Sequence, residues 1–258
     1  MIAGFFALGV VLNLGARIGR FGPNGVINPI VGHSVPMSII GLMLIIVGFF
    51  GFLGGCIIYN PGGQWTSIFG NEVTLSAISF NTLMAFAGGI IGSFIITRQP
   101  FWMMSGGLAG IVSAAPGLDV YYPPLAFLLG TVGGVAAPLA DRFISKYFKI
   151  DDPVGAFGVH GVGGLVGLIG LGVFSGFPNV IEGAPNISFM GQLQSAGVMA
   201  LLGFIPGYAV SYAFAKFGVL RVPPKAEEAG LDLVEVPLQA YPESVPAQNG
   251  NDSGLKPA

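Results

Sequence analysis

The sequence is poor in charge and in the residues that usually hold cofactors. Only 9% of its 258 residues are charged, against about 25% in soluble domains, so the chain could not cover a globular core with polar surface. Its single cysteine, Cys56, excludes an intramolecular disulfide framework and a cysteine-based zinc site. A net charge of −2, with no basic cluster, argues against a nucleic-acid partner. No catalytic carboxylate pair, nucleophile motif, metal cluster or phosphate loop is visible, so the sequence predicts neither an enzyme nor a bound cofactor or metal.

What the sequence has instead is long apolar runs. It is 53% hydrophobic, with 43 glycines and a mean hydropathy of +0.78, and glycine is frequent in membrane helices that pack closely. A crossing needs about 20 apolar residues. The runs that predict crossings are Pro36–Ile58, Val73–Thr97, Trp102–Ala115 (short), Val120–Ala140, Val154–Ser175 and Met190–Ala215.

A shorter run, Ile2–Leu14, follows Met1 directly. It lacks the basic n-region of a signal peptide, which is the alternative interpretation. We interpret it as the second half of a helix whose first half is missing. The predicted fold is therefore an all-α polytopic membrane protein, a partial bundle with about six full transmembrane helices plus a truncated first one.

The basic residues predict the orientation of these segments. Lysine and arginine accumulate in cytoplasmic loops, and all ten of them fall on one side of the seven-segment arrangement. The opposite loops carry only Glu72, Asp119 and Glu182 as charged residues. We expect a multi-pass protein of the cell membrane, with the N-terminus outside and the C-terminus inside. Residues 1–221 form the transmembrane domain, and the polar, proline-rich residues 222–258 form a cytoplasmic tail.

The apolar stretch "VGAFGVHGVGG" carries His160. Glycines recur there every three residues, which lets other helices approach over several faces. An ionisable group nearly two turns inside a membrane helix is rare and usually functional, although a structural histidine is the alternative. A neutral imidazole donates from one nitrogen and accepts at the other, so His160 could bind a small polar molecule or pass a proton.

Two further stretches carry candidate residues. In "GFFGFLGGC", Phe49, Phe52 and Cys56 have the spacing of one helical face, and aromatic rings near a mouth could attract a cation. A lipid-facing or core aromatic cluster is the alternative. In "DDP", Asp151 is expected to cap the following helix, while Asp152 could help hold the arrangement around His160.

Together these residues resemble the ammonium transporter (Amt/Rh) family, on its Amt branch. The resemblance rests on motifs that occur in order along the chain: "RIGRFGP", "GHSVP", "GFFGFLGGC", "DDPVGAFGVHGVGG" and "AEEAGLDL" followed by "AY". The resemblance implies eleven spans and a homotrimer with one conduction path per subunit. This chain matches the end of span five through span eleven and the tail, so the first spans are expected to be missing.

The resemblance also implies roles for individual residues. His160 matches the second of two paired pore histidines, and Phe52 matches a gate phenylalanine. Phe49 and Cys56 stand where a path-lining aromatic and an outer-site serine are usual. Support of the pore is implied for Asp152 and Phe157, and coupling between subunits for the tail residues Gly230 and Asp232.

The implied function is ammonium transport: the cation is recruited at the aromatic mouth, and ammonia passes His160. Methylammonium is the implied analogue, and a cytoplasmic PII-type protein is an implied regulator. Leu53 departs from the asparagine expected after the gate. No second pore histidine is present, because His33 lies in a predicted cytoplasmic loop, where a structural role is expected.

Other interpretations remain open at the level of sequence. A heptahelical receptor shares the segment count, but the half-length first segment does not suit one. A retinal protein needs a lysine inside its last helix, and Lys216 lies at the end of it. A non-transporting ammonium sensor or regulatory subunit, or an incomplete gene product, would carry the same motifs.

Overall fold

The computed structural model describes residues 1–258 except 31, 33, 68–71, 175–186, 232–233 and 235–258. The chain divides into two compact units, Met1–Leu220 and Arg221–Ala258. The first unit contains the helices α1 Ile2–Leu14, α2 Val35–Gly54, α3 Leu75–Thr97, α4 Pro100–Ala114, α5 Pro123–Phe143, α6 Gly163–Phe174 and α7 Phe189–Lys216.

Short elements extend or join these helices. The π-helix η3, Ile144–Phe148, continues α5, and the π-helix η4, Phe157–Val162, leads into α6. Two 3-10 turns, η1 at Pro23–Gly25 and η2 at Ala115–Gly117, follow α1 and α4. A hairpin of β1 Ile58–Asn60 and β2 Gln64–Thr66 follows α2, with Tyr59 paired to Trp65.

The chain is a multi-pass, mostly helical membrane protein, as predicted. Within the described residues, five helical segments are long and apolar enough to cross a bilayer: Val35–Gly54, Leu75–Ile96, Pro123–Phe148, Phe157–Phe174 and Phe189–Lys216. α4, expected as one of the six crossings, has 15 residues and is followed by the turn η2, and α1 has 13 residues. Both are shorter than the roughly 20 residues that a crossing needs.

Local chemistry explains where several helices begin. Ser34, Thr74 and Ser188 each accept a hydrogen bond from the backbone N–H three residues ahead, and so cap α2, α3 and α7. α4 and α5 begin with proline, whose missing N–H costs nothing in the first turn of a helix.

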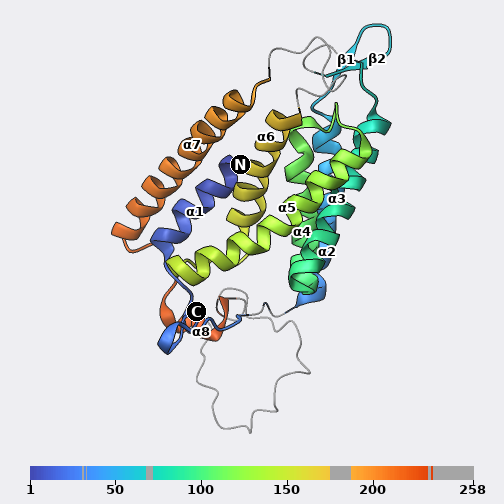
Figure 1. The fold of residues 1–258 in the computed structure, drawn as a ribbon. Helices are drawn as coiled ribbons and strands as arrows, with labels where there is room; N and C mark the ends of the chain where they lie inside the picture. Colours follow the sequence, from blue (N-terminus) through green and yellow to red (C-terminus); the bar gives the residue numbers. More distant parts are fainter. Residues whose placement is uncertain (31, 33, 68–71, 175–186, 232–233, 235–258) are drawn as a thin grey trace. The chain divides into compact units, whose positions relative to one another are not determined.

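The helices of the first unit run alternately up and down (Figure 1). The lysines and arginines of this unit lie in the last turns of α5 and α7 or after α1, α3 and α5, and we call this side the basic end. The opposite side carries β1 and β2 and is called the hairpin end. α3, α4 and α5 pack around a buried core that includes Ala85, Ile111 and Ala126. Ser93 of α3 donates a 2.7 Å hydrogen bond to the carbonyl of Gly134 in α5, which joins two helices that glycines allow to approach closely.

α1 lies beside α7 and beside η4 (Figure 1). Asn13 of α1 donates hydrogen bonds to Ser211 Oγ, at 2.9 Å, and to the carbonyl of Tyr208 in α7, at 3.0 Å. The short helix α1 is therefore held by polar as well as apolar contacts.

The second unit begins at Arg221 and contains the short helix α8, Pro224–Ala229. Arg221 forms an ion pair with Glu227 at 2.8 Å. The role of residues 222–258 as a cytoplasmic tail stays a prediction, and most of that segment lies outside the described residues.

Candidate functional site

His160 lies in the first turn of η4, and its side chain is half-buried. The sequence predicted a position nearly two turns inside the helix, but the helix begins later than expected. The reason is a turn before it, where Gly155 has φ +67° and donates its N–H to the carbonyl of Asp152. A Cβ at Gly155 would collide with the ring of Trp102 in α4, so glycine is needed there for conformation and for space.

Asp152, not Asp151, caps the start of η4. Asp152 Oδ2 accepts a 2.8 Å hydrogen bond from the backbone N–H of Phe157, a group that would otherwise be free at the helix start. The expectation that Asp151 is the cap was therefore wrong. Asp152 is 6% exposed, and its other oxygen, Oδ1, is buried without a hydrogen-bond partner among the described residues.

Asp151 instead binds the segment that follows α1. Its carboxylate accepts hydrogen bonds from Arg17 at Nε (2.8 Å), at the terminal NH2 (2.9 Å) and at the backbone N–H (3.0 Å). Arg20 Nε lies 3.2 Å from Oδ1 of the same carboxylate. Burial raises the pKa of Asp151, but the hydrogen bonds from Arg17 and the charges of Arg17 and Arg20 outweigh it and hold the pKa below its ordinary value. The cluster fixes the end of α1 to the start of the His160 helix.

Two neighbouring helices hold η4 closely. The backbone of α1 at Gly4 lies against the backbone of His160 and Gly161, where a Cβ would collide. Phe5 of α1 packs edge-on against Phe157, with ring centroids 5.3 Å apart. From α4, the buried Ser113 donates a 3.0 Å hydrogen bond to the carbonyl of Gly163, directly after η4. The structure therefore over-determines the backbone on both sides of His160.

Among the residues that the structure describes, the imidazole of His160 forms no hydrogen bond. Its backbone is fixed while its donor and acceptor nitrogens remain available. Such a group can bond to a small neutral molecule that presents both a lone pair and N–H groups.

The predicted residues Phe49 and Phe52 of α2, and Cys56 just after it, lie toward the hairpin end. The rings of Phe49 and Phe52 meet edge to face at 5.8 Å, and Cys56 is an exposed thiol 3.3 Å from the carbonyl of Phe52. Phe52 is 63% exposed, whereas Phe49 packs partly buried against a cluster that includes Val159, the neighbour of His160. The structure therefore brings Phe49 toward the His160 helix and leaves Phe52 and Cys56 on the surface of the described chain.

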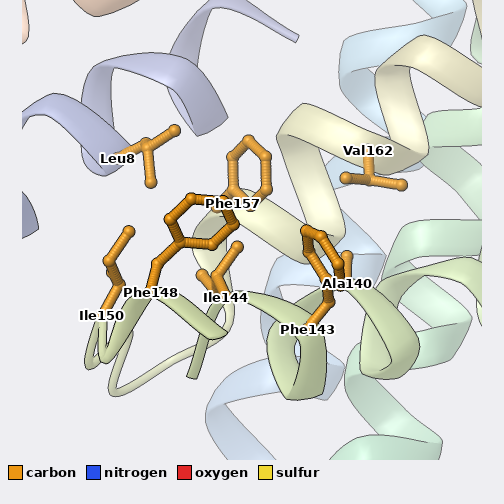
Figure 2. Close-up of a pocket in the computed structure, with 8 residues that line it drawn as sticks. All are labelled: Leu8, Ala140, Phe143, Ile144, Phe148, Ile150, Phe157 and Val162. Carbon is orange, nitrogen blue, oxygen red and sulfur yellow. The ribbon is translucent and has the colours of Figure 1, made fainter. Parts of the chain in front are cut away.

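An apolar cavity of about 400 Å³ lies beside the same helix. Figure 2 shows Phe148 and Phe157 close together in it, with Leu8 from α1 on one side and Val162 on the other. Its lining comes from α1, from α5 and its extension, and from η4: Leu8, Ala140, Phe143, Ile144, Phe148, Ile150, Phe157 and Val162. No polar side chain lines it, so it would not accept a charged ligand. Phe157 is therefore both a wall of the cavity and a packing residue of η4.

The tail residues are placed only in part. Gly230 ends α8 with φ +92°, which suits glycine, and Asp232 lies outside the described residues. Sequence reasoning missed three residues that position the site: Gly4, Arg17 and Ser113. In the sequence, Arg17 indicated only the membrane orientation of the segments, and nothing around Gly4 or Ser113 pointed to His160.

The sequence matches the family described as Ammonium Transporter Family over residues 1–241. Ammonium transporter Amt1 of Methanocaldococcus jannaschii is 32% identical over 247 residues, which cover 94% of this chain and 59% of that protein. Ammonium transporter Amt2 of the same organism is 32% identical over 248 residues, covering 94% and 54%. The chain therefore spans about half the length of the curated relatives that it matches.

Solved structures agree with this match. The structure titled "Sensor Amt Protein" has a TM-score of 0.73 and 30% sequence identity, and the overlap covers 91% of this chain and 57% of that one. Candida albicans Mep2 has a TM-score of 0.66 at 23% identity, with 96% and 56% covered, and supports the fold alone.

Proposed function

The chain belongs to the ammonium transporter family, and from this premise we propose that it forms the His160-bearing part of an ammonium transport path. The observation that carries the proposal is the state of His160. Its backbone is held by α1 and α4, its side chain is half-buried, and its nitrogens have no hydrogen-bond partner among the described residues.

Solvation explains why a path of this kind would conduct ammonia. Moving an unpaired ammonium ion into an apolar medium costs tens of kcal/mol by Born solvation, on the order of ten times the cost for a neutral amine. A selective path therefore binds the cation where water still reaches it, separates the proton and passes the neutral molecule inward. His160 would bond to ammonia within the apolar section.

The hairpin end suits recruitment of the cation. The ring of Phe52 is exposed and meets the ring of Phe49 edge to face. This arrangement supports a role in which an aromatic face attracts a cation from solution. Cys56 adds a weak hydrogen-bonding group beside it. Phe49 and Cys56 are less polar than the residues usual at these positions in the family, so we propose that the external site binds the cation weakly.

Orientation and assembly belong to the same proposal. We place the basic end in the cytoplasm, since lysine and arginine favour that side, and the chain in the cell membrane as a homotrimer. Asp152 and Phe157 support the path, Gly230 and Asp232 couple the tail to neighbouring subunits, and a PII-type protein is the proposed regulator. The proposed role involves no enzymatic step.

A second candidate role is an ammonium sensor that does not transport. The observation that favours it is the 30% identity to the structure titled "Sensor Amt Protein". Uptake measurements separate the two roles, because a sensor would bind ammonium without accumulating its analogue.

The test is His160→Ala, compared with the native protein in cells that lack their own ammonium transporters. Uptake of labelled methylammonium should change while the amount of protein in the membrane stays the same. Glu72→Gln, a change at an exposed carboxylate of the hairpin end, is the control and should leave both quantities unaltered. If His160→Ala instead lowers membrane abundance and leaves uptake per molecule unchanged, His160 is structural and the proposed path is wrong.

A further inference from the structure

We propose that the apolar cavity beside η4 binds one acyl chain of an anionic phospholipid, whose headgroup pairs with Lys146 and Lys149. The cavity has a volume of about 400 Å³, and no polar side chain lines it. An apolar cavity of about 150 Å³ binds benzene, so by proportion this one takes on the order of sixteen carbon atoms. That is the size of one acyl chain and is too small for a whole phospholipid.

The cavity is open at its aromatic wall. The side chains of Phe143 and Phe148 are 54% and 62% exposed although both line the cavity, whereas Ile144 between them is buried. On the inner side the cavity ends at Phe157 and Val162 of η4 (Figure 2). A chain from the surrounding bilayer can therefore reach the cavity at the exposed rings.

Cations lie on the same stretch of chain as this wall. Between positions 140 and 150, Arg142, Lys146 and Lys149 are interleaved with residues that line the cavity. Asp141 is the one carboxylate in that stretch, so the stretch carries an excess of positive charge. The site thus combines an apolar interior with a basic rim at the basic end of the bundle.

The two lysines of this rim contact neutral groups. Lys146 Nζ lies 5.2 Å from the ring centroid of Tyr147, and Lys149 Nζ donates a hydrogen bond of 3.4 Å to the carbonyl of Gly25. Among the residues that the structure describes, neither lysine forms an ion pair with a carboxylate. Their charges are therefore available to an anion outside the chain.

An anionic phospholipid fits both features at once. Its acyl chain would occupy the cavity while its phosphate stays outside, so no charge enters the apolar space. Long lysine side chains can follow an apolar surface and still present their ammonium groups at its edge. Basic pockets between membrane helices on the cytoplasmic side are typical sites for anionic headgroups, and the orientation proposed above places the basic end on that side. A neutral lipid would leave the lysines without an anion, and a soluble anion would leave the cavity empty.

The first test locates the acyl chain and needs no transport. The full chain, purified in mild detergent, is mixed with a phosphatidylglycerol that carries a diazirine at the end of one acyl chain. After illumination, peptide mass spectrometry should find the label at Phe143, Phe148 or Phe157. Ala140→Phe, which fills the cavity, should abolish this labelling. Lys216→Gln is the control and should not change it, because α7 contributes no residue to the lining.

The second test measures the headgroup preference, by competition with a phosphatidylcholine that has the same acyl chains. One lysine near an anionic headgroup contributes about fivefold, equivalent to about 1 kcal/mol. The double variant Lys146→Gln/Lys149→Gln should therefore lower the preference for phosphatidylglycerol roughly 25-fold, and Lys216→Gln should leave it unaltered. Both lysines are exposed, so this variant remains informative if Ala140→Phe fails to fold.

Three results would overturn the site. The first is label outside the cavity lining in the native protein, which would show that something other than a lipid chain covers the cavity. The second is native labelling in a folded Ala140→Phe variant. The third is equal competition by the two lipids in the native protein, which would show that the lysines do not select an anionic headgroup.

Discussion

The ion pair between Arg17 and Asp151 predicts an asymmetry between its two partners. The side chain of Asp151 is 1% exposed, whereas Arg17 is 31% exposed. Removing Arg17 leaves a buried carboxylate with only Arg20 beside it. Removing Asp151 leaves the guanidinium of Arg17, which water already reaches, and that of Arg20, whose side chain is 15% exposed and therefore less buried than Asp151. Breaking a buried pair costs about 3–5 kcal/mol when the remaining charge stays buried, and about 1–3 kcal/mol is typical of a lost hydrogen-bonded partner.

We therefore expect Arg17→Ala to lower the free energy of unfolding by about 3–5 kcal/mol, and Asp151→Ala by about 1–3 kcal/mol. Reversible denaturation in detergent micelles, followed by circular dichroism, measures both. Arg98→Ala is the control, because the guanidinium of this basic-end residue lies over the ring of Phe94 at 5.6 Å, a contact worth about 1 kcal/mol or less. The reasoning is refuted if Asp151→Ala proves more destabilising than Arg17→Ala, or if Arg17→Ala matches the control.

Three further predictions follow from the same contacts. Gly4→Leu should move α1 away from His160 and reduce methylammonium uptake per molecule at least as strongly as His160→Ala, whereas equal uptake to native would show that the close approach is unimportant. The pKa of Asp151 is lower in the folded protein than its unfolded value of about 4, so Asp151 stabilises the fold above that pH and this stabilisation is lost as the pH falls through the folded pKa. Acid denaturation of the native protein should show this loss, and the Arg17→Ala variant should lack it. Cys56 is exposed at the hairpin end, so a membrane-impermeant maleimide should label it from outside intact cells; labelling only in inverted vesicles would reverse the proposed orientation.

The helices were predictable because their signal is local. A run of apolar residues identifies a membrane segment from composition alone, and the observed α3, at Leu75–Thr97, lies within two residues of the predicted Val73–Thr97. The short α4, at Pro100–Ala114, likewise lies within two residues of the predicted Trp102–Ala115. The contact between Phe49 and Phe52 in α2 was also predictable, since residues three apart share a helical face. Cys56 lies beyond the end of α2 at Gly54.

The support around His160 was not predictable, because it depends on residues far apart in the chain. Arg17 and Asp151 are separated by 134 positions, and no local pattern indicates which of two adjacent aspartates binds an arginine and which caps a helix. The sequence favoured Asp151 as the cap because acidic residues followed by a proline at the first helical position are typical of a helix start. The positive φ of Gly155 delays the helix, and that delay transfers the cap to Asp152.

The π-helical turn links these supports to the cavity. In an α-helix, residues five apart point about 140° away from each other, whereas i→i+5 hydrogen bonding brings them onto one side. Phe157 and Val162 are five apart, and both line the apolar cavity (Figure 2). His160 lies between Phe157 and Val162 in the sequence but does not line the cavity. The turn therefore separates the apolar side of η4 from the side that carries the imidazole. π-helical turns are rare and occur mostly as single turns; here the Asp152 cap, the Gly4 contact and the Ser113 hydrogen bond hold this one. The same contacts that make the turn stable therefore fix the direction of the group proposed to meet ammonia.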